Sequence, residues 1–265
     1  MGERVESIRT GPDHERAAEL ATAAGELLLR VRGREFGDPG ARKAAGDAES
    51  HEFLLDRLRT LQPGDAVLSE EGADDAARLT AERVWIVDPL DGTREFSELD
   101  RADWAVHVAL WERGDLAAGA VALPAEGLTL GTGRPPALPP RAGGPLRLAV
   151  SRTRPPALVA DLAAALGAEL VPMGSAGVKA TAVLRGQVDA YVHGGGQYEW
   201  DSAAPVAVAR AAGAHASRLD GSPLAYNRPD PWLPDLLVCR PELAADLIDA
   251  LAGLVPADRN GGGRP

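Results

Sequence analysis

The sequence predicts a layered α/β protein in which helices pack on sheets, and three observations support this class. Amphipathic runs at helical spacing dominate residues 12–61. Short apolar runs typical of strands follow, up to residue 123. After a stretch rich in Gly, Pro and Arg at residues 131–145, strand and helix patterns alternate. With 265 residues, 45% of them hydrophobic, the chain is long enough for two halves, which we expect at residues 1–145 (α+β) and 146–265 (α/β).

Two helices are expected first. Apolar residues recur at helical spacing from Pro12 to Val31, which predicts one long helix. Residues 33–46 break this periodicity and are expected to form a loop; whether it closes over a site as a lid is left open. Helical spacing resumes over residues 48–61 and stops at Pro63. Strands are then expected at residues 66–68, 84–87, 104–111 and 117–123.

The second half has the alternation that is typical of a sheet flanked by helices. Strands are expected at residues 146–150, 170–172, 189–192 and 236–238. Helices are expected at residues 157–166, 178–185 and 203–212. We expect the end of the chain, residues 259–265, to be disordered.

The composition argues against several classes of protein. A formal net charge of −11 repels a phosphate backbone, so we expect no nucleic acid polymer as a partner. No segment approaches the roughly 20 apolar residues of a membrane span, and Met1 to Arg4 lack an apolar signal region. The one cysteine, Cys239, lies in an apolar stretch and is expected in the core. These features predict a soluble, cytoplasmic protein.

Carboxylates cluster in three separate elements. These elements are Ser69-Glu70-Glu71-Gly72, Asp88-Pro89-Leu90-Asp91-Gly92-Thr93 and Glu199-Trp200-Asp201. Hard cations such as Mg²⁺ take oxygen ligands, usually carboxylates completed by water and substrate phosphate. Asp88 and Asp91 flank a turn, so their side chains and the Leu90 carbonyl can converge. We expect Pro89 to end the strand, so that Asp88 leaves the sheet edge and points into a crevice.

All three elements resemble those of the Mg²⁺-dependent, lithium-sensitive phosphomonoesterases, a family that includes inositol monophosphatase, fructose-1,6-bisphosphatase and the 3′(2′),5′-bisphosphate nucleotidases. The resemblance rests on Ser69-Glu70-Glu71, on Trp85 to Thr93 and on Trp200 to Pro205, and it extends from the first helix to about Asn227. It implies the sugar-phosphatase fold, an αβαβα sandwich. It also implies a small phosphorylated substrate, and family relatives are often homodimers.

Within this family the chain looks most similar to the bacterial CysQ-type branch, which removes the 3′-phosphate of 3′-phosphoadenosine 5′-phosphate. This part of the resemblance rests on residues 91–96, 174–180 and 195–201. Three other functions stay open. One is inositol monophosphatase or fructose-1,6-bisphosphatase activity at the same site, and another is a non-catalytic protein that binds metal or nucleotide. The third is a haloacid-dehalogenase-type phosphatase, although that group spaces its two aspartates two positions apart and Asp88 and Asp91 are three apart.

The resemblance implies a set of metal ligands and a set of catalytic groups. Glu70, Asp88 and the Leu90 carbonyl would hold a first Mg²⁺, while Asp88, Asp91 and Asp201 would hold a second. A third, looser ion would depend on Glu70, which makes two to three ions in all, and Li⁺ would inhibit by displacing one. The resemblance also implies that Asp47 and Thr93 orient the attacking water and accept its proton, with Glu70 as a further catalytic residue.

The expected substrate contacts are more widely spread. They are Gly92, Thr93, Ser175, Lys179 and Asp201. Lys179 follows Ser175 by one helical turn, so both could face the substrate, but a lysine on a surface helix explains it equally well. Asp201 could also serve only as a helix cap. Arg94 and Arg152 are candidates for a second phosphate, and His107 is expected in the core because it interrupts an apolar strand.

Overall fold

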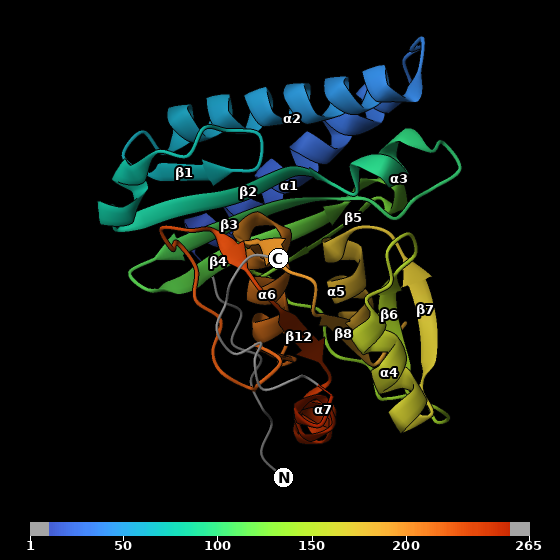
Figure 1. Ribbon diagram of the computed structural model, residues 1–265. Coiled ribbons are helices and arrows are strands. Elements are labelled where there is room, and N and C mark those ends of the chain that lie inside the picture. Colours follow the sequence, from blue (N-terminus) through green and yellow to red (C-terminus); the bar gives the residue numbers. More distant parts are fainter. Residues whose placement is uncertain (1–10, 255–265) are drawn as a thin grey trace.

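The computed structural model describes residues 11–254 and contains two five-stranded sheets with helices outside and between them. Figure 1 shows five layers in succession: α1 with α2, the first sheet, α5 with α6, the second sheet, and α4 with α7. The expected layered α/β class and its αβαβα order are therefore confirmed. The end at 259–265, expected to be disordered, lies outside the described residues.

The first sheet has the strand order β1-β2-β3-β4-β5. Its members are β1 (Ala66–Ser69), β2 (Arg83–Asp91), β3 (Ala105–Glu112), β4 (Asp115–Leu123) and β5 (Leu128–Gly131). β1 and β2 are parallel, and the other pairs are antiparallel. β2 reads as a continuous apolar run because helices cover both faces. Val84 and Ile86 pack toward α5 and α6, whereas Trp85 and Val87 pack toward α1 and α2.

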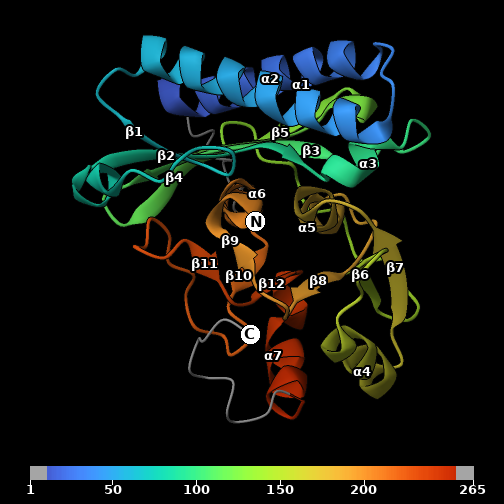
Figure 2. The ribbon, with the colours of Figure 1, turned by 45° about the horizontal axis from the view of Figure 1, so that its top comes forward.

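Two long helices, α1 (Pro12–Arg32) and α2 (Pro39–Leu61), cover the outer face of this sheet (Figure 2). The expectation of a loop over residues 33–46 is wrong for most of its length. Asp38 caps α2 by accepting a hydrogen bond from the Ala41 N–H at 2.9 Å, and Pro39 follows at the first helical position. The first turns of α2 carry no large apolar residue, and at Gly46 a Cβ would lie 2.7 Å from the Phe96 ring and 2.9 Å from Leu90.

The second sheet has the order β10-β12-β8-β6-β7. Its members are β6 (Arg147–Ser151), β7 (Glu169–Met173), β8 (Ala190–His193), β10 (His215–Ser217) and β12 (Leu236–Cys239). Between the sheets lie α5 (Ala176–Leu184) and α6 (Glu199–Ala211), whereas α4 (Ala157–Leu166) and α7 (Ala244–Ala252) lie outside. Cys239 is buried in β12, as expected. Among residues 11–254, none of the helices combines the length and apolar character that crossing a membrane requires.

Several short elements were not expected from the sequence. They are β5, β10, α7, α3 (Thr93–Ser97), a small sheet of β9 (Gln197–Tyr198) with β11 (Trp232–Leu233), and three 3₁₀ turns, η1 (Ala76–Thr80), η2 (Pro124–Glu126) and η3 (Pro241–Leu243). Most of them carry too few residues to show a period. Three of them bear on the site: α3 begins at Thr93, β9 leads into the helix of Asp201, and η1 follows the loop containing Glu70.

The end of β2 differs from the expectation drawn from Pro89. Pro89 does not end the strand: β2 continues to Asp91, with an irregularity in its pairing to β3 between Asp88 and Asp91. β2 lies inside the sheet, between β1 and β3, so Asp88 does not leave from a sheet edge. The irregularity lets two carboxylates three residues apart face the N-termini of α5 and α6.

Candidate metal centre

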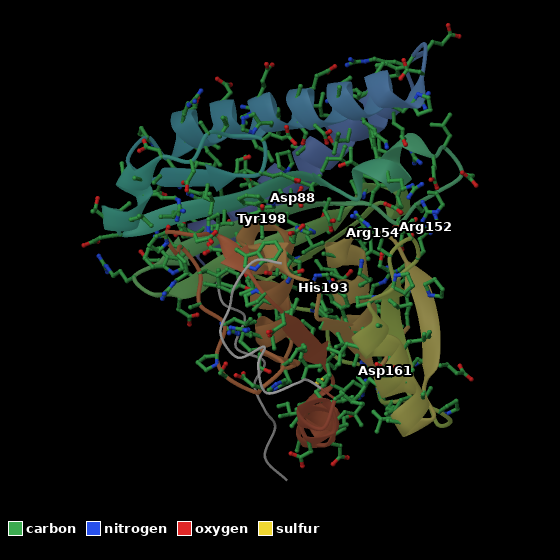
Figure 3. The ribbon with its side chains drawn as sticks, viewed as in Figure 1. Asp88, Arg152, Arg154, Asp161, His193 and Tyr198 are labelled. Atoms are coloured by element: carbon green, nitrogen blue, oxygen red, sulfur yellow. The ribbon has the colours of Figure 1, made fainter. Side chains whose placement is uncertain are left out.

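At least one carboxylate from each of the three acidic elements lies where β2 ends against α5 and α6, whereas the Glu199 carboxylate binds the N–H groups of Asn227 and Arg228 instead. Figure 3 labels Asp88 at this place, between the first sheet and α6. Asp88, Asp91, Glu70 and Asp201 lie close enough for the charge of each to influence the ionisation of another. Three segments far apart in the sequence therefore form one acidic cluster.

Asp88 lies at the centre of this cluster and is 1% exposed. Its Oδ1 accepts a hydrogen bond from the Leu90 N–H at 3.0 Å, whereas its Oδ2 is buried without a hydrogen-bond partner among the described residues. Burial, followed by the charges of Glu70, Asp91 and Asp201, raises the pKa of Asp88 well above its ordinary value. A buried carboxylate oxygen without a donor is costly, so the arrangement fits a bound cation.

The neighbouring acids show the same mutual repulsion. Burial and the charge of Asp201 raise the pKa of Glu70, which remains exposed at the edge of the cluster, to about 7. Burial and the charge of Asp91 raise the pKa of Asp201 to about 6. A divalent cation among these groups would reverse the sign of their environment and favour the ionised carboxylates.

Asp91 is held by the N-terminus of α5. Its carboxylate accepts hydrogen bonds from the Ser175 hydroxyl, from the Ala176 N–H at 3.1 Å and from the Gly177 N–H at 2.7 Å. Burial raises the pKa of Asp91, but the charge of His107 and these hydrogen bonds outweigh it and lower the pKa below its ordinary value. Asp91 is thus the carboxylate of the cluster that the protein keeps ionised.

His107 takes part in the cluster, although the sequence indicated only a core position. It is buried in β3 directly opposite Asp88, and its Nε2 lies 3.1 Å from Asp91 Oδ2. Its Nδ1 donates to the Trp200 carbonyl at 3.0 Å. Burial lowers the pKa of His107, but the charge of Asp91 and the hydrogen bonds to Asp91 and to the Trp200 carbonyl together outweigh it, and the net shift is upward. Ligand atoms of Asp88, Asp91 and His107 lie within 4.8 Å of one another, so these three residues could hold a metal ion.

Asp47 and Thr93 meet beside the cluster, from α2 and the start of α3. The Thr93 hydroxyl lies 3.2 Å from the Leu90 carbonyl and 3.5 Å from Asp47 Oδ1. Burial and the charge of Glu71 raise the pKa of Asp47 to about 6. Gly92, just before Thr93, has φ +84°, and a Cβ there would lie 3.1 Å from the Ser175 Cβ. The pair is brought together, and its role in catalysis stays a prediction.

Asp201 is the third residue of α6. Its Oδ2 accepts a hydrogen bond from the Tyr198 N–H at 2.7 Å, so the carboxylate does cap the helix. This bond uses one of its two oxygens, and the cap is therefore compatible with a second role as a metal ligand. That second role stays a prediction.

Ser175 and Lys179 do not both point away from the protein toward a substrate: the Ser175 hydroxyl binds Asp91, and Lys179 binds backbone carbonyls. Lys179 is 6% exposed, and its ammonium group donates to the carbonyls of Gly174 at 3.1 Å and Ser175 at 2.6 Å. Burial lowers the pKa of Lys179, opposed by the charge of Asp91. The alternative of a lysine on an exposed helix surface is therefore wrong, while contact of either side chain with substrate stays a prediction.

The two arginines considered for a second phosphate are both ion-paired. Arg152, labelled in Figure 3, contacts Glu95 at 2.8 Å and Glu98 at 2.6 Å, and Arg94 lies 3.5 Å from Glu98. A phosphate at Arg152 would have to compete with two carboxylates, whereas the exposed pair of Arg94 with Glu98 is a weak one.

Known proteins are similar to this chain in sequence and in fold. Residues 13–134 and 147–252 match the model of the inositol monophosphatase family. A 3′-phosphoadenosine 5′-phosphate phosphatase from Mycobacterium tuberculosis is 55% identical over 241 residues, covering 86% of this chain and 89% of that protein. The 3′(2′),5′-bisphosphate nucleotidase CysQ of Escherichia coli is 31% identical, covering 83% of this chain and 96% of that protein. The crystal structure of CysQ from Bacteroides thetaiotaomicron has a TM-score of 0.77 at 26% identity, covering 88% of this chain and 99% of that one.

Proposed function

Because this chain belongs to the inositol monophosphatase family, we propose that it is a metal-dependent phosphomonoesterase that removes the 3′-phosphate of 3′-phosphoadenosine 5′-phosphate. The observation that carries the reaction class is the buried, unpartnered Asp88 oxygen among Glu70, Asp91 and Asp201, because such a cluster needs a cation. The choice of substrate is supported by the relatives that are 54% and 55% identical, which are named for that activity.

We assign the metal ligands to the acidic cluster. Glu70, Asp88 and the Leu90 carbonyl would hold one Mg²⁺, and Asp88, Asp91 and Asp201 a second, with a third depending on Glu70. Bound Mg²⁺ supplies Lewis-acid stabilisation of the phosphate and activation of a water, and Li⁺ would inhibit by competing for this cluster. His107 would stay on Asp91 as a neighbour of the ligands, since its Nε2 lies 3.1 Å from Asp91 Oδ2 and its Nδ1 is engaged with the Trp200 carbonyl.

The remaining residues would handle the water and the substrate. Thr93 would orient the water, and Asp47 would accept its proton: a carboxylate with a pKa of about 6 is mostly ionised near neutral pH, yet basic enough to accept a proton. The backbone at Gly92 and Thr93 would face the ester phosphate. Ser175, Lys179 and Asp201 would lie toward the rest of the nucleotide.

Phosphate release tests this function. The full chain would be assayed with Mg²⁺, and then with EDTA, on 3′-phosphoadenosine 5′-phosphate, inositol 1-phosphate and fructose-1,6-bisphosphate side by side. We expect metal-dependent release with a strong preference for the nucleotide. Preference for inositol 1-phosphate or the fructose ester would contradict the substrate and leave the reaction class intact. Release from none of the three would contradict both.

A further inference from the structure

A network of charged and polar groups centred on the buried Arg78, with Asp74 at its exposed edge, lies outside the acidic cluster. Arg78, in η1, is 1% exposed. Its guanidinium donates to both Asp74 oxygens at 2.6 and 2.9 Å, to Asn227 Oδ1 at 2.7 Å and to the Arg228 carbonyl at 2.9 Å. A guanidinium is costly to bury unless its donors are paired, so these bonds fix the position of Arg78 closely.

Glu199 binds the other side of the turn at residues 227–228, whose first side Arg78 contacts. It is 1% exposed, and its two oxygens accept hydrogen bonds from the N–H groups of Asn227 at 2.6 Å and Arg228 at 2.8 Å. The Asn227 side chain also donates to the Arg78 carbonyl at 3.2 Å. The turn at residues 227–228 is therefore held between a buried cation and a buried anion.

Each end of this network connects to one side of the metal centre. Asp74 and Arg78 lie on the segment that follows Glu70 directly, whereas Glu199 opens α6, whose third residue is Asp201. Glu70 follows β1 and Asp201 lies in the first turn of α6, so two segments far apart in the sequence have to be held in place for both carboxylates to reach one centre. Groups that repel one another and still have to share a cation need support from outside the cluster.

We propose that Asp74, Arg78, Asn227 and Glu199 form a brace that fixes the Glu70 segment relative to the Asp201 helix and thereby sets the affinity of the centre for divalent cations. Arg78 and Asn227 are positioning residues in this scheme, because they act on the ligands through the backbone. The inference rests on the proposed function only in taking Glu70 and Asp201 as metal ligands.

A substitution at Asn227 can disrupt the brace with little other change to the structure. Its φ is +58°, a conformation that glycine adopts without strain. Asn227→Gly therefore keeps the backbone N–H that Glu199 accepts and removes only the side chain that Arg78 holds. Arg78→Lys is the second variant, because an ammonium keeps the charge but cannot make the forked contacts with Asp74 and Asn227.

The chain also provides a matched control. Arg83 forms a comparable network with Asp13, Asp65 and Glu112 at the start of β2, the end of that strand opposite to Asp88. Arg83→Lys perturbs a multivalent arginine without touching the brace. It separates a specific effect on the metal centre from a general loss of stability.

The experiment measures the Mg²⁺ dissociation constant of the full-length variants by calorimetric titration, together with their melting temperatures. We expect Asn227→Gly and Arg78→Lys to weaken Mg²⁺ binding by about three- to thirtyfold, the usual range for residues that act on a site indirectly. Arg83→Lys should keep the Mg²⁺ dissociation constant within about twofold of the parent's, even if its melting temperature falls as much as those of Asn227→Gly and Arg78→Lys. Asn227→Asp, which restores an acceptor oxygen to Arg78 and tolerates positive φ, should bring Mg²⁺ binding back toward that of the parent.

Equal Mg²⁺ affinity in the parent, Asn227→Gly and Arg78→Lys would overturn the proposal. So would a loss no larger than that of Arg83→Lys, or no recovery in Asn227→Asp. These outcomes are independent of the substrate. A parent protein that binds Mg²⁺ but releases no phosphate from the nucleotide would contradict the proposed function and leave the brace intact.

Discussion

Asp88 and Asp91 are three residues apart, yet their surroundings shift their pKa values in opposite directions. Burial raises the pKa of Asp88, and the charges of the three other carboxylates raise it further. Asp91 faces the start of α5 and His107, and its pKa falls. Asp91 is therefore satisfied by the protein, whereas Asp88 depends on a cation.

Replacing Asp88 by Asn should separate stability from function. The change removes one charge from a repelling buried cluster, so we expect the metal-free variant to melt about 2–4 °C higher, equivalent to about 1 kcal/mol in a chain of this size. Mg²⁺ binding and phosphate release should both be lost. Thermal melts with EDTA and with Mg²⁺ measure this, and Asp161→Asn on the exposed face of α4 is the control. A metal-free Asp88→Asn protein that melts well below the parent would contradict the account of the site.

Asp47 and Thr93 should affect turnover and leave metal binding unchanged. Asp47→Asn removes the proposed proton acceptor and should lower kcat by about 10²- to 10⁴-fold, while Thr93→Ala should have a smaller effect. Steady-state kinetics at saturating Mg²⁺ measure the loss, and Mg²⁺ titration of each variant should match the parent. Thr22→Ala, which removes an exposed threonine hydroxyl bonded to Thr129, provides the control. Unchanged kcat in both variants would remove the pair from the mechanism.

At the scale of single elements, the α5 N-terminus positions Asp91 more than any other segment does. Ser175, at φ +45°, bonds both Asp91 and the Val178 N–H, while Lys179 holds the carbonyls of residues 174 and 175. Gly177 fits because the His107 ring occupies the space beside it: a Cβ there would lie 2.0 Å from His107 Nε2. The approach of helix and strand thus depends on a missing side chain.

Gly177→Ala should therefore damage the site through packing. Overpacking typically costs about 1–3 kcal/mol, which corresponds to a melting temperature lower by about 2–12 °C, and Mg²⁺ binding should weaken as Asp91 is displaced. Melting curves and Mg²⁺ titration test both effects. Gly143→Ala, where a Cβ meets nothing within 4 Å, should change neither. An unaltered Mg²⁺ affinity in Gly177→Ala would show that Asp91 does not depend on this contact.

The sequence predicts a feature well when a few consecutive residues determine it, and poorly when contacts between distant segments do. The acids of Ser69 to Gly72 and Asp88 to Thr93 could be found because each lies within a few consecutive residues beside a strand. His107 could not be assigned a role, since only its pairing opposite Asp88 places it in the cluster. The network of Arg78, Glu199 and Asn227 could not be predicted for the same reason, because three segments far apart in the sequence form it. The start of α2 was missed because Ala and Gly near Gly46 give no apolar period.

At the scale of the whole molecule, the site lies where the layers meet. The first sheet contributes Asp88, Asp91 and His107, and the helices between the sheets contribute Asp201 and the residues that hold Asp91. Core residues of β2, α5 and α6 form one apolar cluster around these polar groups. Displacing either helix would therefore change the site, and the ionisation of the site should in turn influence the stability of the whole fold.

The contribution of the acidic cluster to the stability of the metal-free protein should fall as pH rises from about 4.5 to about 7. The pKa values of Glu70, Asp88 and Asp201 are raised in the folded state, so these groups bind more protons in the folded protein than in the unfolded chain over this range. The raised pKa of His107 acts in the same direction, because its contribution is present at low pH and is lost as the imidazole deprotonates. The lowered pKa of Asp91 has the opposite effect only below its ordinary value of 3.8. Outside the cluster, burial lowers the pKa values of His51, His193 and His215, and these groups oppose the trend as pH rises toward 6.5.

Bound Mg²⁺ should remove this loss of stability at higher pH, because a cation favours the ionised carboxylates. The rise in melting temperature on adding Mg²⁺ should therefore be larger at pH 8 than at pH 5, where protons occupy the same groups. Melting curves at the two pH values, each with Mg²⁺ and with EDTA, give the comparison. In Asp88→Asn, which lacks the central carboxylate, the rise should be small at both. A Mg²⁺-induced rise in the parent that is equal at pH 5 and pH 8 would mean that the cation binds away from these acids, and the assignment of the centre would be wrong.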